Sequence, residues 1–520
     1  MKKIKFKMSF IVLLLITFTI VLGACSSKTD TKALENSKKV VDEGTPQKGG
    51  NATIAYETDV ANFDPIKASG GINFPLLFPV YDTLIHFSPD LEPQPGLAVS
   101  WKYSNDSTLI LTLRENVKFH DGTPFNAEAV KFNIDRINSD KSMLTDLKNI
   151  ISVKVIDEKT VQLNLKQPDS SILLALSDQA GMMVSPTAVE KNGESYSQHP
   201  IGTGPFKMSR HVPNGEIVYE ANKEYWDKDL PYLDKMTVKI MPEETTRINA
   251  LKSGEVDFAE NISPGTVSSL VNDKNLKVLQ EISLPFKMLY LNDAKAPLDN
   301  KAVRQAINFG IDREALIKAI NFGIGEPAYQ PFPKAYWAAN KDLKINYDPE
   351  KAKQILKEAG INKVSFTLVH HSMAYDQRVA EAIKSQLAEI GIEVKLQAME
   401  QQAALANFWD EKKANSFLGR WSARPDPQIT MKALYSSGSY YNTGHTTAEI
   451  DKLIAEAGKT YDQEKRAKLY RQISEKAILE EAIGIPLFFT PRTAIMNQSL
   501  KGYVPNKLEK PVFSTLWKKE

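Results

Sequence analysis

Residues 364–396 follow a strand–helix–strand pattern that restricts the possible folds more than any other stretch of the chain. The mostly apolar residues 364–369 predict a buried strand, residues 376–390 predict a helix, and residues 392–396 predict a second strand after Gly391. Two strands joined through a helix run parallel, because the helix returns the chain to the end of the sheet where the first strand began. The sequence therefore predicts a parallel sheet and an α/β fold in this half.

His370, His371 and Ser372 directly follow the first of these strands and are expected to form a loop. The carboxyl end of a strand is where open α/β sheets meet their ligands, so this segment is a candidate site. Metal coordination is the less favoured alternative, because a metal ion needs more ligands and the other histidines are scattered. They are His86, His120, His199, His211 and His445. No metal and no cofactor are therefore expected.

A second candidate loop follows residues 51–56, where Ala52, Ile54 and Tyr56 alternate with other residues and predict a strand. The loop, residues 57–65, is polar and aromatic and ends at a proline. Its place after a strand suits a ligand, although an ordinary connection is the alternative interpretation.

A third candidate is the segment G-R-W-S-A-R-P-D-P, residues 419–427. Its prolines fix backbone angles and are expected to prevent a helix, which predicts a stiff and exposed loop. Trp421 would offer a flat apolar face, and Arg424 a planar fork that grips a carboxylate with two hydrogen bonds. The alternative is a surface loop in which Arg424 and Asp426 pair with each other.

Composition limits the function classes that the chain can serve. Its 520 residues suffice for two or three domains, and a formal net charge of +2 gives no drive toward nucleic acid. His120 beside Asp121 could suggest acid–base chemistry, but a turn histidine bonded to nearby backbone is the favoured interpretation. Neither G-x-S-x-G nor H-E-x-x-H occurs, so an enzyme is not predicted.

The first 24 residues read as a secretory signal peptide. Residues 1–7 are basic, residues 8–22 are almost wholly apolar, and L-G-A-C ends at Cys25, the single cysteine. This ending looks like a bacterial lipobox, which implies cleavage before Cys25 and lipidation of its thiol. Residues 26–48 are polar and predict a flexible tether. Alternatives are an uncleaved anchor or plain secretion. The lipobox predicts a lipid-anchored protein on the extracytoplasmic face of the cell membrane, or in the periplasm, depending on the type of cell envelope.

Four motifs follow one another along the chain. They are R-E-N-V-K-F-H-D-G-T-P-F-N-A-E-A-V at 114–130, P-I-G-T-G-P-F at 200–206, L-D-N-K-A-V-R-Q-A-I-N-F-G-I-D-R at 298–313 and W-S-A-R-P-D-P at 421–427. In this order they resemble the family 5 extracellular solute-binding proteins of bacterial ABC importers, and the resemblance covers residues 49–520. That family binds oligopeptides, dipeptides, glutathione, opines or nickel complexes.

The resemblance implies an α/β, two-lobed, periplasmic-binding-protein-like fold of type II, with a hinge between the lobes. The N-terminal lobe would span 49–292 with an inserted subdomain at about 82–203, the second lobe 293–484, and a return to the first lobe 485–520. The chain would thus cross near Asn292 and Gly484. The implied partners are ABC permease and ATPase subunits, and the protein is expected to be a monomer.

The resemblance also implies which residues face the ligand from three loops. They are Tyr56, Glu57 and Thr58, then His371 and Ser372, then Trp421, Arg424 and Asp426. Peptide binders of this family typically carry an aspartate shortly after the tryptophan, to hold a peptide's amino terminus. Here Ala423 and Arg424 stand there, closer to a glutathione-type W-S-G-R-P-D-P.

An arginine at this place prefers a carboxylate to an ammonium group. The favoured ligand is therefore a short peptide or a glutathione-like carboxylated solute. An opine-like carboxylate and a metal–chelator complex are the alternative ligands. A lipoprotein that senses a peptide without feeding a transporter is the alternative role, and Asp426 could either meet an amine or orient Arg424.

Overall fold

The computed structural model describes residues 44–68 and 74–519. The predicted signal peptide, Cys25 and most of the predicted tether lie outside the described residues. Within these two ranges, no helix has the length and apolar character that a membrane crossing requires.

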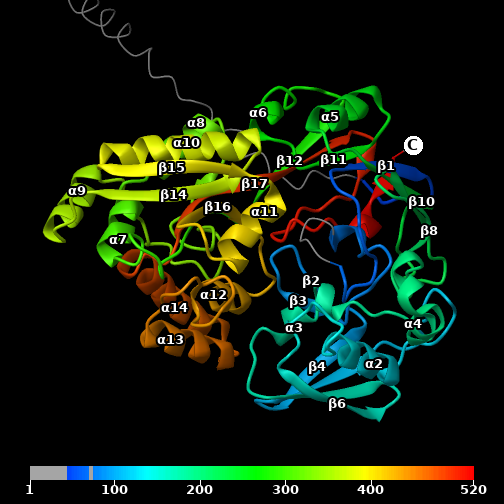
Figure 1. The fold of residues 1–520 in the computed structure, drawn as a ribbon. Coiled ribbons are helices and arrows are strands. Elements are labelled where there is room, and N and C mark those ends of the chain that lie inside the picture. Colours follow the sequence, from blue (N-terminus) through cyan, green and yellow to red (C-terminus); the bar gives the residue numbers. More distant parts are fainter. Residues whose placement is uncertain (1–43, 69–73, 520) are drawn as a thin grey trace, which may run out of the picture. The chain divides into compact units, whose positions relative to one another are not determined.

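One mixed sheet runs through the described chain in the order β15-β14-β16-β12-β17-β11-β1-β10-β9-β8, with β13 also paired to β17 (Figure 1). Two long strands, β12 and β17, occupy its middle and separate the strands of one half from those of the other. The strands are β1 (Asn51–Tyr56), β8 (Phe206–Val212), β9 (Glu216–Ala221), β10 (Lys235–Ile240), β11 (Phe258–Glu260), β12 (Leu276–Leu291), β13 (Glu326–Pro327), β14 (Val364–His371), β15 (Ile392–Met399), β16 (Ser416–Trp421) and β17 (Ile485–Asn497).

The half built on β1 and β8 to β11 is called lobe one here. The strand predicted at 51–56 is confirmed: β1 pairs in parallel with β10 and β11, and Ala52, Ile54 and Tyr56 are buried. Helices α5 (Glu244–Ser253) and α6 (Pro264–Val267) lie beside β11 in sequence. The apolar core of this lobe includes Met496 and Leu516 from the C-terminal segment. The end of the chain is therefore part of lobe one.

Within the predicted insertion at about 82–203 lies a separate antiparallel sheet in the order β4-β5-β7-β6, called the subdomain here. Helix α2 (Ala127–Ile137) begins after Asn126, whose side chain accepts a hydrogen bond from the Ala129 amide, as a helix cap does. The subdomain has its own apolar core. Its elements are β2 (Ile85–Phe87), β3 (Pro93–Pro95), β4 (Ala98–Asn105), β5 (Thr108–Leu113), β6 (Ile150–Asp157), β7 (Thr160–Leu165) and α3 (Ile172–Ala175), whereas α4 (Pro186–Asn192) packs in the lobe one core.

The half built on β14, β15 and β16 is called lobe two. The strand–helix–strand unit is confirmed, because β14 and β15 are parallel and α10 (Ala374–Glu389) connects them. The expectation that His370 and His371 form a loop was wrong: both belong to β14, and they pair with Ala398 and Met399 of β15. The two histidines belong to the strand because the pairing of β14 with β15 continues to Met399, the last residue of β15.

Helices surround the strands of lobe two (Figure 1). Most begin at a side-chain cap, for example Asp312 before α8 and Asp348 before α9. The apolar core around β14 and β15 contains only residues of this half and of β12 and β17, whereas a second core also includes Leu91 and Leu508. The helices are α7 (Lys301–Phe309), α8 (Arg313–Ile320), α9 (Pro349–Glu358), α11 (Gln401–Leu405), α12 (Pro427–Tyr435), α13 (Ala448–Lys459) and α14 (Gln463–Ser474).

Strands β12 and β17 belong to both lobes. Residues 276–282 of β12 pair with 491–497 of β17 on the lobe one side, and residues 286–291 pair with β16 of lobe two. Between Ile282 and Phe286 the register shifts through a bulge. The predicted crossing points, Asn292 and Gly484, lie at the lobe two ends of these strands, beyond the bulge.

Candidate functional site

A cavity of about 170 Å³ lies between the lobes and the subdomain. Both lobes contribute charged side chains to it, so it can hold a polar ligand on several sides. Its lining comprises Tyr56 and Glu57 after β1, Phe74, Asp146, Ala175, Asp178, Gln179 and Ala180, Asn261, Pro285 in the β12 bulge, Arg420, Ser422, Ala423, Arg424 and Pro425 around the end of β16, Arg492 of β17, and Leu508, Glu509 and Lys510.

The segment at 419–427 differs from the expected exposed loop. Strand β16 continues to Trp421, which is only 4% exposed and packs in the lobe two core. Pro427 is the first residue of α12 rather than a helix breaker, because its fixed φ suits the first helical turn. The expectations of an exposed indole and of a segment that prevents a helix were therefore wrong. From this segment, Arg420 and the short stretch 422–425 line the cavity.

Asp426 has a structural position beneath this loop. Its side chain caps α12 by accepting a hydrogen bond from the Gln428 amide at 2.7 Å, and it forms an ion pair with Arg466 of α14. The carboxylate is 1% exposed. Its partners are thus Gln428 and Arg466, not Arg424.

Arg424 is half-buried at the cavity wall. Its guanidinium carbon lies 6.0 Å from the centroid of the Trp421 ring. Among the described residues, no side chain or backbone group forms a hydrogen bond or an ion pair with Arg424. An arginine fork in a partly dry site is a strong binder of carboxylates, because charge-assisted bonds strengthen where water is excluded.

Arg492 of β17 forms the centre of a buried ionic network on the lobe one side. Its guanidinium lies 3.2 Å from a carboxylate oxygen of Glu260, 4.0 Å from Glu57 and 3.9 Å from Glu509. Burial lowers the pKa of Arg492, but the surrounding carboxylates, led by Glu260, raise it above its ordinary value. Tyr503 donates a hydrogen bond to Glu260. Arg492 is therefore permanently charged and largely neutralised by protein groups.

Two more ion pairs lie at the cavity. Arg420 of β16 donates to both carboxylate oxygens of Glu509, and Lys510 pairs with Asp178. The first pair links lobe two to the C-terminal segment of lobe one. Burial raises the pKa of Glu509, but Arg420 and Arg492 outweigh this and hold it below its ordinary value.

The loop after β1 brings Tyr56 and Glu57 to the cavity, while Thr58 is half-buried and does not line it. The Glu57 carboxylate accepts a hydrogen bond from Asn261 through one oxygen. Its other oxygen is buried and has no hydrogen-bond partner within the described ranges.

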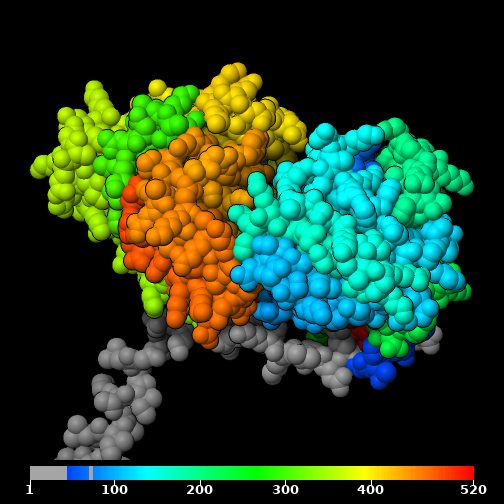
Figure 2. All heavy atoms as spheres, turned by 90° about the horizontal axis from the view of Figure 1, so that it is seen from below, coloured from blue at the N-terminus to red at the C-terminus, as the bar shows by residue number. Residues whose placement is uncertain are grey.

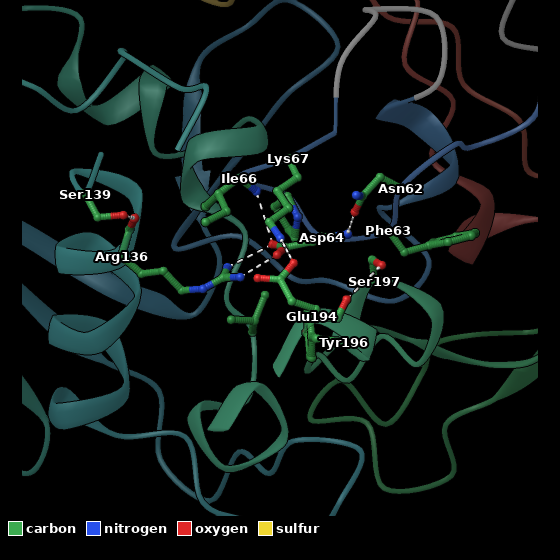
Figure 3. Close-up of polar contacts among 12 residues, drawn as sticks. Asn62, Phe63, Asp64, Ile66, Lys67, Arg136, Ser139, Glu194, Tyr196 and Ser197 are labelled. Carbon is green, nitrogen blue, oxygen red and sulfur yellow. Dashed lines mark hydrogen bonds and ion pairs between the residues drawn. The ribbon is translucent and has the colours of Figure 1, made fainter. Parts of the chain in front are cut away.

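Asp64 fixes the far end of this loop by a two-bond ion pair with Arg136 of α2 (Figure 3). The side chain of Asp64 is only 4% exposed, so the ion pair is largely shielded from water. Because Arg136 ends a subdomain helix, this pair ties the subdomain to the loop that reaches the cavity.

His371 and Ser372 do not line the cavity. The His371 ring packs edge-on against Phe417 at 5.2 Å between centroids, and burial lowers its pKa. His370 is buried, with Nδ1 2.8 Å from the His371 carbonyl oxygen. Across the residues that the structure describes, no group of three or more His, Cys, Asp or Glu side chains could hold a metal ion.

His120 forms a hydrogen bond with the backbone, as the favoured interpretation of the sequence expected. Its Nε2 lies 2.9 Å from the Gly204 carbonyl oxygen, so the interpretation as a histidine bonded to backbone is confirmed. Burial lowers its pKa to about 4. A histidine in this state is neutral and serves the fold.

A second contact between lobe two and the subdomain lies away from the cavity-lining residues. Tyr461, between α13 and α14, packs against Tyr103 of β4 in a tilted arrangement with 4.4 Å between ring centroids, and its hydroxyl donates to the Asp106 carbonyl at 2.7 Å. The Ser170 amide donates to the Gly458 carbonyl at 2.8 Å. Figure 2 shows this meeting of the orange segment of lobe two with the blue and cyan subdomain.

Sequence reasoning missed several cavity residues. Arg492, Glu509 and Lys510 come from the C-terminal part of the chain, and Asp146 comes from a subdomain loop. None stands in a local motif, so only the long-range pairing of β11 with both β1 and β17 could have placed Arg492 near the first strand. Arg420 was within the recognised segment, but its partner Glu509 is distant in sequence.

Comparison with known proteins agrees with this architecture. The model of bacterial extracellular solute-binding proteins, family 5 Middle, matches residues 92–442. The glutathione-binding protein GsiB of Salmonella typhi is 31% identical over 469 residues, which cover 87% of this chain and 91% of that protein.

Two solved structures show the same fold. One is the ABC transporter-associated periplasmic binding protein DppA from Helicobacter pylori in complex with the peptide STSA, with a TM-score of 0.80, 26% identity and coverage of 91% of this chain and 99% of that one. The other is the binding protein AgaA from A. tumefacien R10 in complex with agropinic acid, with a TM-score of 0.79, 26% identity and the same coverages.

The fold and the cavity between its lobes define a two-lobed solute-binding protein. The chain belongs to family 5 of the bacterial extracellular solute-binding proteins. The resemblance noted from the four motifs is thereby confirmed, as is the two-lobed α/β fold. The family consists of binding proteins rather than enzymes, and its members work outside the cytoplasm.

Proposed function

We propose that this chain is the substrate-binding lipoprotein of an ABC importer and captures a short peptide or a glutathione-like carboxylated solute. The observation that carries the ligand class is Arg424, a cation at the cavity wall with no carboxylate partner in the described part of the chain. Its neighbours Arg420 and Arg492 already have protein carboxylates. Arg424 is thus the cation available to a ligand carboxylate.

Tyr56 and Glu57 are proposed to contact the ligand from lobe one, as the lining of the cavity supports. Trp421 would act from behind, by packing under the loop that carries Arg424. Asp426 would fix that loop through α12 and Arg466. Thr58, His371 and Ser372, expected at the ligand, have less support because they lie outside the lining.

The bulge in β12 is the proposed hinge. The two strands that cross between the lobes change register there, and a bulge interrupts the ladder so that the strand can bend. Closure around a ligand would then bring Arg420 to Glu509 and Tyr461 to Tyr103 in one movement. An ABC permease could distinguish the closed form by the positions of the two lobes.

Residues 1–48 support the proposed location. A signal peptide ending at Cys25 would yield a lipidated protein that is held at the extracytoplasmic face of the membrane, near its permease and ATPase subunits. The protein is proposed to act as a monomer.

The test begins with the ligand that copurifies with protein lacking residues 1–25, identified by mass spectrometry, and continues with a thermal-shift screen. The screen contains dipeptides, tripeptides, glutathione, opines and nickel–histidine. A ligand at 100 times its Kd adds about 2.7 kcal/mol to the free energy of unfolding, which raises the midpoint visibly. Thermal shifts caused by peptides or glutathione support the proposal. If only opines or nickel–histidine cause a shift, the proposed ligand class is wrong. Binding without uptake by cells that contain the permease would favour the sensing role.

A further inference from the structure

The charged groups that line the cavity differ in whether the protein already neutralises them. The lining contains four cations: Arg420, Arg424, Arg492 and Lys510. Three of these have a carboxylate within 4.0 Å, and Arg424 is the cation that, within the described ranges, has none.

The four carboxylates that line the cavity also differ in whether another protein group binds them. Glu509 pairs with Arg420, Asp178 with Lys510, and Glu57 has both Asn261 and the more distant Arg492. Asp146 is exposed, and no other described residue donates a hydrogen bond to it or forms an ion pair with it. The cavity thus has one unpaired cation from lobe two and one unpaired carboxylate from the subdomain.

The backbone around Asp146 is held in place by both its neighbours and its loop. Leu147, the next residue, is fully buried in the subdomain core. The Met143 amide donates to the Ile66 carbonyl at 3.0 Å, and the Asn138 side chain donates to the Ile150 carbonyl at 3.1 Å, which closes the base of the loop. The Asp146 carboxylate therefore projects from a fixed backbone rather than a free tail.

We infer that Asp146 is a specificity-determining residue that receives the ammonium group of a zwitterionic ligand whose carboxylate binds Arg424. This inference rests on the proposed function and narrows it, because it requires an amine as well as a carboxylate. A ligand with both groups supplies each unpaired side chain with an opposite charge. A dicarboxylate would leave Asp146 facing a like charge, which opposes binding.

Glu57 is the competing partner for an ammonium group, because one of its carboxylate oxygens is buried without a hydrogen bond from any described residue. However, Asn261 and Arg492 already stabilise the charge of Glu57. Asp146 has no such partner among the described residues, so its carboxylate is left for a cation of the ligand. Replacing Asp146 and Glu57 separately distinguishes which of the two binds the ammonium group.

The experiment uses isothermal calorimetry with four probes: glutathione and trialanine, each with a free amine and with that amine acetylated. Asp146→Asn is compared with the wild-type protein and with Asp140→Asn, an exposed aspartate in the same loop that does not line the cavity. Glu57→Gln provides the competing assignment. For whichever free-amine probe binds the wild-type protein, Asp146→Asn should weaken binding by roughly ten- to a hundredfold. The affinity for the acetylated form of that probe should change little. Asp140→Asn should match the wild type.

The pattern of losses decides between the assignments. The inference is overturned if acetylation weakens binding equally in wild-type and Asp146→Asn protein, or if Glu57→Gln alone removes the preference for a free amine. It is also overturned, while carboxylate capture by Arg424 stands, if the acetylated probes bind the wild type as tightly as the free amines. If no carboxylated probe binds, the proposed function fails and the assignment of Asp146 fails with it.

Discussion

Arg420 and Glu509 form an ion pair that joins the two lobes at the wall of the cavity, with Nη2 of Arg420 2.7 Å and 2.6 Å from the two carboxylate oxygens. Arg420 belongs to β16 of lobe two, and Glu509 to the C-terminal segment of lobe one. Ser283, in the β12 bulge, also donates to Glu509. The bulge, the cavity and the contact between lobes are thus linked through one carboxylate.

Replacing Arg424 by alanine should weaken ligand binding by roughly 1.5 to 3 kcal/mol, because a charge-assisted bond to the ligand carboxylate is lost. Calorimetry with the ligand that emerges from the screen measures this directly. Arg378→Ala, an exposed arginine of α10 that does not line the cavity, is the matched control. Equal affinities for Arg424→Ala and wild-type protein would exclude Arg424 as the carboxylate anchor.

Replacing Tyr461 by alanine should lower ligand affinity by roughly three- to tenfold although Tyr461 does not line the cavity. The ring contact with Tyr103 and the hydrogen bond to the Asp106 carbonyl favour the arrangement in which lobe two meets the subdomain, so their loss favours the open form. Small-angle X-ray scattering of the unliganded protein should show a larger radius of gyration. Tyr347→Ala, which removes a bond to Glu389 within lobe two, should change neither quantity. An unchanged affinity would show that this contact does not set closure.

Acid should destabilise the protein through His120. Burial lowers the pKa of His120 from 6.5 to about 4, so folded protein keeps it neutral where the unfolded chain takes up a proton. The unfolded state is then favoured progressively as the pH falls from 6.5 to 4, by up to about 3 kcal/mol. Thermal midpoints measured across this range should fall less steeply for His120→Gln than for wild-type protein. The exposed His199→Gln control should keep the wild-type slope. Parallel slopes for all three proteins would argue against this role for His120.

Replacing Cys25 by serine should release the protein from membranes, because acyl chains on the thiol are the proposed anchor. Fractionation of cells that express each form measures the distribution, and labelled palmitate should enter the wild-type protein alone. A serine variant that stays with the membrane would mean that the uncleaved leader holds it.

Local periodicity was sufficient to predict β1 and the unit from β14 to β15. Alternation of apolar residues every second position and a helix ended by glycine are properties of short windows. Such features depend little on the rest of the chain.

The loop around Trp421 shows where this reasoning failed. Proline is compatible both with a loop and with the first turn of a helix, and the sequence alone did not decide between them. The decision comes from Asp426, which caps α12 and is itself fixed by Arg466, a residue on another helix. The cavity likewise depends on Glu509 and Asp146, which approach Arg420 and Arg424 only after distant strands have paired.

The pairing of β12 with β17 also dictates an order of assembly. Most of lobe two lies in the sequence between these strands, and its core around β14 and β15 is complete once Phe488 of β17 has been synthesised. Lobe one, in contrast, needs Met496 and Leu516 for its core. A chain that emerges from its amino terminus can therefore fold lobe two while lobe one still exposes apolar surface. Lobe one is therefore the first lobe to be synthesised and the last to complete its core. Truncation near the carboxyl end would remove core residues of lobe one, although most of that lobe was made earliest.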